Sequence, residues 1–106
     1  MSSGLPESAL QKIVAVLAQA PAIERAVLYG SRARGTARAT SDIDIALAGD
    51  HLTLADKARV ELALDDLMLP WKIDLCVMHL VTDPALLANI KHDSCILYER
   101  GKSNQT

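Results

Sequence analysis

The sequence contains no phenylalanine, and aromatic residues make up only 3% of its 106 positions. A hydrophobic core must therefore be built from Ala, Val, Leu and Ile, and a hydrophobic fraction of 50% supplies enough of them for one small domain. The shortage of aromatic rings also argues against a protein that binds single-stranded nucleic acid, because such proteins stack bases on aromatic side chains.

Positive charge is not in excess either. The chain has 11 Lys and Arg against 13 Asp and Glu, which gives a net charge of −2 at pH 7. This balance argues against a general affinity for nucleic acid backbones, and we expect no direct nucleic acid partner. Long hydrophobic runs and the features of a signal peptide are absent as well, so we expect a soluble protein without a membrane partner.

The chain has only two cysteines, Cys76 and Cys95, which show neither a CxxC spacing nor a histidine at metal-ligand spacing. This pattern is typical of buried, reduced thiols. It predicts a protein of the reducing cytoplasm.

Apolar residues at helical spacing predict three helices, and shorter alternating or apolar segments predict strands between them. The predicted helices cover residues 6–20, 54–69 and 84–91, and the predicted strands cover residues 26–29, 42–48, 71–78 and 95–99. This order indicates an α/β fold, a mixed β-sheet packed with helices. We expect a single domain over residues 1–101 and a polar tail over residues 102–106.

The loop between the first two predicted strands combines arginines with aspartates in the run GSRARGTARATSDIDIAL. Asp42 and Asp44 lie two residues apart in a strand, so their side chains share one face, with Cα atoms about 6.5–7 Å apart. Their charges repel each other unless a cation lies between them. The pair therefore predicts a site for Mg²⁺, with two ions expected in phosphoryl-transfer chemistry.

Groups that bind phosphate precede these acids. Gly30 permits a tight turn, and Ser31 offers a hydroxyl and an N–H at the expected start of a short helical turn. Arg32 and Arg34 can donate charge-assisted hydrogen bonds to phosphate oxygens. Arg38 lies further along the loop, and we interpret it as a solvated residue within reach of the outer phosphates.

Asp74 is a third acid, in the middle of the third predicted strand, whose other face is apolar. If this strand lies beside the strand of Asp42, Asp74 reaches the same site. It could there bind a second metal ion and accept a proton from an attacking hydroxyl. Lys72 on the same face could be its counter-charge or a phosphate contact.

Each feature alone has a more ordinary explanation. Two aspartates on a strand usually form a solvated sheet face, a Gly-Ser step is usually a turn, and loop arginines usually aid solubility. A single acid on an edge strand is usually only a surface charge. The combination of all four features in this order favours a functional site.

The same residues resemble a known family. Gly30-Ser31, followed after ten residues by Asp42-Ile43-Asp44, is similar to the signature of the DNA polymerase beta-like nucleotidyltransferase superfamily. The wider run resembles the minimal nucleotidyltransferase (MNT) family, and Asp74 falls where that family has its third carboxylate. The resemblance implies catalysis and metal binding by Asp42, Asp44 and Asp74. It implies nucleotide binding by Gly30, Ser31, Arg32, Arg34 and Ser41.

The MNT resemblance also implies partners. Members are similar to antitoxins encoded beside an RNase toxin with an all-helical HEPN domain. By this resemblance, the protein is expected to transfer AMP from ATP to a tyrosine of that toxin. The ATP, the toxin and the tyrosine are implied by the resemblance alone.

Two other functions stay open at this point. One is nucleotidyl transfer to a small molecule such as an antibiotic, and the other is an antitoxin that acts by binding alone. The presence of all three acids argues against a site that has lost its activity. A domain of this size is often held in an oligomer or a hetero-complex.

Overall fold

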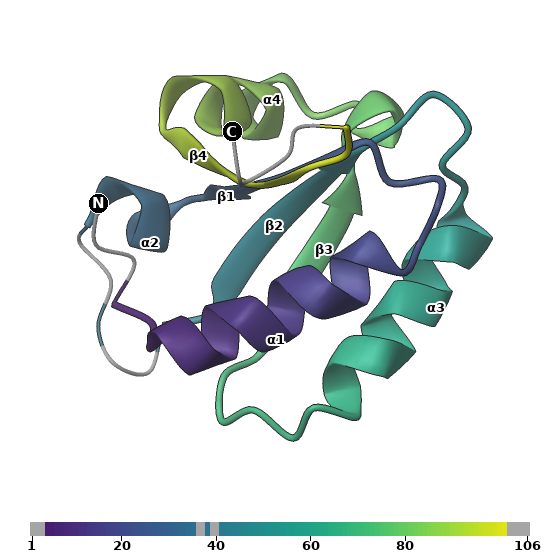
Figure 1. Ribbon diagram of the computed structural model, residues 1–106. Helices are drawn as coiled ribbons and strands as arrows, with labels where there is room; N and C mark the ends of the chain where they lie inside the picture. Colours follow the sequence, from purple (N-terminus) through teal and green to yellow (C-terminus); the bar gives the residue numbers. More distant parts are fainter. Residues whose placement is uncertain (1–3, 36–37, 39–40, 102–106) are drawn as a thin grey trace.

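The computed structural model describes residues 4–35, 38 and 41–101, so the predicted tail over residues 102–106 lies outside the described residues (Figure 1). In chain order, the elements are α1 (Glu7–Ala18), β1 (Arg25–Tyr29), α2 (Ser31–Arg34), β2 (Ile43–Ala48), α3 (Leu54–Asp65), β3 (Ile73–Val77), the 3₁₀ turn η1 (Met78–Leu80), α4 (Pro84–His92) and β4 (Ser94–Glu99). Every predicted helix and strand is present, and the expected helical turn after Gly30 is α2.

The four strands form one sheet in the order β3-β2-β1-β4. β1 pairs antiparallel with both β2 and β4, whereas β2 and β3 are parallel. Parallel neighbours require a crossover connection, and α3 supplies it. The predicted mixed α/β sheet is therefore confirmed. β3 is an edge strand, which leaves one side of it without a neighbouring strand.

The two faces of the sheet differ in what covers them. α1 and α3 lie on one side in Figure 1 and α4 lies on the other. The larger core packs between the sheet and the helices α1 and α3, with Ile43, Ile45 and Leu47 of β2 fully buried in it. The smaller core lies under α4, where Ile90 packs against Ala46. The alternation of β2 therefore turns Asp44 toward the α4 side.

Local signals in the sequence explain where α3 begins. Thr53 accepts a hydrogen bond from the N–H of Asp56, whose carboxylate accepts one from the N–H of Thr53. This capping box satisfies two N–H groups that a helix start leaves unpaired. The third strand is shorter than predicted, because residues 71 and 72 precede it in a bend and Met78 begins η1.

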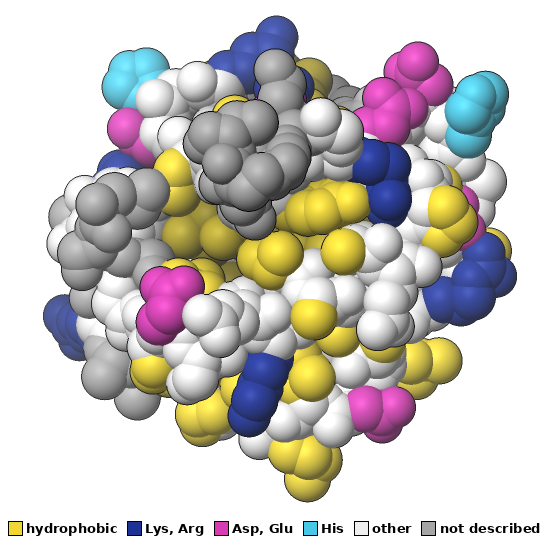
Figure 2. All heavy atoms as spheres, viewed as in Figure 1, with side chains coloured by type: hydrophobic (Ala, Val, Ile, Leu, Met, Phe, Trp, Pro, Cys, Tyr) yellow, Lys and Arg dark blue, Asp and Glu magenta, His cyan; other side chains and the backbone are white. Residues whose placement is uncertain are grey.

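None of the helices in the described ranges is long and apolar enough to cross a membrane. On the face shown in Figure 2, basic and acidic side chains are interspersed, so no continuous basic surface extends over it. This distribution agrees with the charge balance of the sequence.

Candidate active site

The register of the sheet brings two of the predicted acids side by side. Asp44 pairs with Asp74 across the parallel β2–β3 contact, and with Tyr29 across the antiparallel β1–β2 contact. Paired residues point to the same face, so Tyr29, Asp44 and Asp74 form a row on the face that α4 only partly covers. Asp42 lies just before β2 and is exposed.

Gly30 fits closely against Asp44. Its backbone has φ 78° and ψ −153°, a conformation that is essentially limited to glycine. A Cβ atom at this position would lie only 2.7 Å from Oδ2 of Asp44. Gly30 therefore lets β1 end against this carboxylate, and the next residue, Ser31, begins α2.

The two arginines of α2 have different environments. Arg34 is exposed, and its positive charge partly offsets the causes that raise the pKa of Asp44. Arg32 is only 1% exposed, and its guanidinium donates hydrogen bonds to the backbone oxygens of Ser41 and Arg38. Phosphate binding by Arg34 fits its exposure, whereas these hydrogen bonds of Arg32 go to the loop that precedes Asp42.

Ser41 also has a role within the loop. Its hydroxyl accepts a hydrogen bond from the N–H of Arg38 at 2.8 Å, and its own N–H donates to the carbonyl of Arg38 at 3.0 Å. Ser41 thus stabilises the turn that leads into Asp42. The Arg38 side chain is exposed, in keeping with its interpretation as a solvated residue.

Mutual repulsion is visible at Asp44. Burial raises the pKa of this carboxyl above its ordinary value, and the negative charges of Asp74 and Asp42 raise it further, while the positive charge of Arg34 opposes them. All three predicted acids therefore interact electrostatically at one place. A cation bound between them would relieve this repulsion.

Tyr29 is a site residue that the sequence reasoning left unassigned. It is 8% exposed, its hydroxyl lies 3.8 Å from Sγ of Cys76, and it stands beside Asp44 in the sheet. Burial is the main cause that raises the pKa of the Tyr29 hydroxyl, and Cys76 and both acids add to it. The feature of the sequence that could have identified Tyr29 is its position one residue before Gly30.

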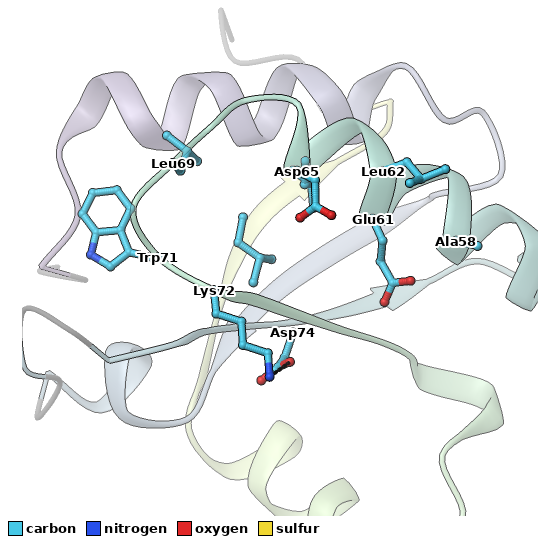
Figure 3. Close-up of a pocket in the computed structure, with 10 residues that line it drawn as sticks. Ala58, Glu61, Leu62, Asp65, Leu69, Trp71, Lys72 and Asp74 are labelled. Carbon is cyan, nitrogen blue, oxygen red and sulfur yellow. Dashed lines mark ion pairs between the residues drawn. The ribbon is translucent and has the colours of Figure 1, made fainter.

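A cavity of about 540 Å³ borders the row at the sheet edge. It lies between α3 and β3, and Figure 3 shows Asp74 and Lys72 together on one side of it, joined by an ion pair with 3.9 Å between Nζ and Oδ1. The cavity includes Asp74 but not Asp44 or Gly30. It therefore reaches the acids only from the side of β3.

Comparison with known proteins agrees with this geometry. The sequence profile of the family described as "Polymerase beta, Nucleotidyltransferase" matches residues 11–103, most of the chain. The chain belongs to this nucleotidyltransferase family. No curated protein matches its sequence significantly.

Solved structures share the fold of this nucleotidyltransferase. A toxin–antitoxin complex with AMP-PNP is 22% identical, with a TM-score of 0.71 over 91% of this chain and 75% of that chain. A tri-AMPylated Shewanella oneidensis HEPN toxin in complex with MNT antitoxin is 19% identical, with a TM-score of 0.67 over 88% and 71%. A structure described as a candidate minimal nucleotidyltransferase is 27% identical, with a TM-score of 0.65 over 90% and 95%. The family match confirms the nucleotidyltransferase resemblance stated from the sequence, and these structures agree with it in fold.

The residues of the nucleotidyltransferase fit a magnesium ion that is shared with substrate. Within the described ranges, no three His, Cys, Asp or Glu side chains come close enough to hold a metal ion by themselves. Mg²⁺ does not need such a cage, because it commonly takes one or two carboxylates together with substrate phosphates and water. Asp42 and Asp44, with Asp74, would supply the carboxylates. Burial is the main cause that raises the pKa of Asp44, and the negative charges of Asp74 and Asp42 add to it.

The raised pKa of Asp44 predicts a stability effect. The folded-state pKa of Asp44 is raised, so the folded protein holds this proton more tightly than the unfolded chain, and stability is lost as pH rises through that pKa. Asp44→Asn should therefore raise the melting temperature of the nucleotide-free protein at pH 7. We expect a gain of about 2 °C, because solvent screens a partly exposed carboxylate.

Thermal unfolding followed by circular dichroism between pH 4 and 8 measures this effect. The gain should shrink as pH falls toward the raised pKa of Asp44. Asp50→Asn is the control, since Asp50 is exposed and lies in the turn after β2. An Asp44→Asn variant that melts below the wild type at pH 7 contradicts the predicted repulsion.

Proposed function

We propose that this nucleotidyltransferase is an antitoxin that transfers AMP from ATP to a tyrosine of a HEPN-domain RNase toxin, in a Mg²⁺-dependent reaction. The observation that carries the proposal is the pairing of Asp44 with Asp74 on one open face, with Gly30 packed against Asp44. Structures that share the fold include a complex with AMP-PNP and a complex of MNT antitoxin with an AMPylated HEPN toxin. These neighbours support the choice of nucleotide and of partner.

Nucleotide binding is assigned to the start of α2 and the loop before β2. Ser31 and Arg34 would face the phosphates, because α2 begins at Ser31, directly after the Gly30 that packs against Asp44, and the charge of Arg34 acts on that acid. Gly30 leaves space for the phosphates to approach the backbone. Ser41 contributes by shaping the loop that presents Asp42.

Asp42 and Asp44 are the residues that would hold Mg²⁺ with the phosphates, and Asp74 would hold a second ion. The bound metal supplies positive charge that orients the triphosphate and stabilises the leaving pyrophosphate. This role explains why the chain places like charges together at a cost to its own stability.

Asp74 is the residue best placed to accept a proton. Its side chain is 48% exposed and stands on the edge strand, where the hydroxyl of another protein can reach it. In the reaction, the tyrosine oxygen bonds to the α-phosphorus of ATP, its proton passes to Asp74, and the bond to pyrophosphate breaks. An in-line arrangement of the entering oxygen and the leaving oxygen is required.

An open site also favours a protein as the acceptor. The cavity beside Asp74 lies between α3 and an edge strand and is lined by both charged and apolar side chains. A protein partner brings its own surface to such a site and needs no enclosed pocket. We place the reaction in the cytoplasm, where cysteines such as Cys76 and Cys95 stay reduced.

The test is transfer to the neighbouring gene product. The chain is mixed with the product of the neighbouring gene, which the proposal expects to be a HEPN-domain protein, together with ATP and Mg²⁺, and the intact mass of the partner is measured. Each AMP unit should add about 329 Da, and fragmentation should locate it on a tyrosine. Omission of Mg²⁺, and an ATP analogue with a methylene bridge between the α- and β-phosphorus in place of ATP, serve as controls, because AMP transfer breaks the α–β bond.

Other outcomes identify the alternatives. An unmodified partner that is bound and silenced indicates an antitoxin that acts by contact alone. Modification of an aminoglycoside in a parallel reaction, with no change in the partner, indicates a small-molecule nucleotidyltransferase. Either result contradicts the proposed transfer to a protein tyrosine.

A further inference from the structure

Arg32 is the most enclosed charged side chain among the described residues, at 1% exposure. Its Nη2 donates to the carbonyl of Ser41 at 2.8 Å and to that of Arg38 at 3.4 Å, and its Nε donates to Ser41 at 3.2 Å. Two N–H groups thus bind the same carbonyl oxygen, one residue before Asp42. The planar fork of a guanidinium can do this, whereas the ammonium of a lysine cannot.

Trp71 covers the same guanidinium. The Cζ atom of Arg32 lies 5.8 Å from the centre of the Trp71 ring, within the range of a cation–π contact. Trp71 is half-buried and packs against the main core, and Figure 3 shows it in the segment that leads into β3. A Cβ atom added to Gly4 would lie 3.2 Å from Nη1 of Arg32, so the N-terminal segment also encloses it.

These contacts join the two segments that carry the acids. Ser41 immediately precedes Asp42, and Trp71 lies three residues before Asp74. A backbone hydrogen bond of 2.8 Å from the N–H of Ile43 to the carbonyl of Lys72 connects the same two segments. The position of Arg32 therefore affects how Asp42 and Asp74 stand relative to each other.

We propose that Arg32 and Trp71 form a clasp that positions the acidic site, and that Arg32 is a positioning residue instead of a phosphate ligand. The proposal rests on the proposed nucleotidyl transfer and adds the residues that hold its geometry. The two arginines of α2 then have separate tasks, because Arg34 is exposed at Asp44 while Arg32 is enclosed by protein.

The first test uses Trp71 as a reporter, since it is the only tryptophan in the chain. Arg32→Lys keeps the charge and removes the fork, so the Trp71 ring should lose its cover. In the nucleotide-free protein we expect a red-shifted emission and about a twofold larger acrylamide quenching constant. Arg34→Lys is the matched control and should leave the fluorescence of the free protein unchanged.

The second test separates positioning from binding by kinetics. A displacement of the acids by about 1 Å can cost on the order of 10²-fold in rate. Arg32→Lys should therefore lower kcat for AMP transfer about 10- to 100-fold and change KM for MgATP by less than about threefold. Arg34→Lys should act mainly on KM, because it weakens a contact with phosphate.

Trp71 supplies a second pair of variants in case Arg32→Lys does not fold. Trp71→Phe retains an aromatic face over the guanidinium and should keep most of kcat, whereas Trp71→Leu should lose about as much as Arg32→Lys. Equal kcat for Trp71→Phe and Trp71→Leu overturns the clasp. An Arg32→Lys variant with wild-type fluorescence, wild-type kcat and a raised KM also overturns the clasp, because a raised KM alone is what loss of a phosphate ligand produces.

The fluorescence measurement on Trp71 needs neither ATP nor an acceptor protein. A wild-type protein that transfers no AMP would contradict the proposed function. The quenching of Arg32→Lys against Arg34→Lys would still decide whether the clasp exists. The proposed AMP transfer is therefore tested by mass spectrometry, and the clasp of Arg32 and Trp71 is tested separately by fluorescence quenching.

Discussion

Asp74→Asn should lower the rate of AMP transfer about 10²- to 10⁴-fold, the range that a general base contributes. Asparagine has nearly the same volume as aspartate, so packing at β3 should be preserved. Its amide cannot accept the proton of the tyrosine hydroxyl. MgATP affinity should change little, because Asp42 and Asp44 remain.

The position and exposure of Asp74 support the predicted loss of activity. Asp74 pairs with Asp44 in the sheet and yet is 48% exposed, so it faces both the metal-binding acid and the acceptor side. Lys72 lies 3.9 Å away and is itself largely exposed. A weak surface ion pair of this kind leaves the carboxylate available for proton transfer.

The measurement is a quenched time course of partner modification by mass spectrometry, with MgATP titrated by calorimetry in parallel. Asp65→Asn is the matched control, since Asp65 lines the same cavity from α3. It should transfer AMP within about twofold of the wild-type rate, as surface substitutions usually do. If Asp74→Asn transfers at the wild-type rate, Asp74 is not the base.

The acid row was largely predictable from the sequence. Alternation along residues 42–48 predicted that Asp44 faces away from Ile43, Ile45 and Leu47, and the structure buries those three residues in the main core. Asp42 precedes β2, and its place on the same face as Asp44 stays a prediction. The position of Asp74 depended on one further fact, that β3 is the neighbour of β2. Alternation within a strand predicts which face of the sheet a residue occupies. Only the pairing between strands determines which residues lie beside it.

The different environments of the two arginines could not be predicted. Arg32 and Arg34 stand two residues apart in α2, and nothing in the local sequence distinguishes a buried guanidinium from an exposed one. Burial of Arg32 depends on carbonyls of the following loop and on Trp71, which is distant in sequence. Such contacts follow from tertiary packing and not from spacing along the chain.

Gly30→Ala should weaken both stability and MgATP binding. The φ and ψ of Gly30 lie in a region that other residues occupy at a cost of about 1–3 kcal/mol. The added Cβ would also lie 2.7 Å from Oδ2 of Asp44, so this carboxylate must rotate away. A displaced metal ligand should lower AMP transfer about 10²-fold or more.

Gly35→Ala separates these two causes. Gly35 has nearly the same φ of 79°, in the left-handed helical region, and a Cβ there would meet nothing within 4 Å. Its substitution should cost about 1–2 kcal/mol through backbone strain alone. Thermal unfolding should then show both variants destabilised, while calorimetry shows weak MgATP binding only for Gly30→Ala. Equal MgATP affinity in the two variants would mean that the contact between Gly30 and Asp44 does not set the position of the metal-binding carboxylate.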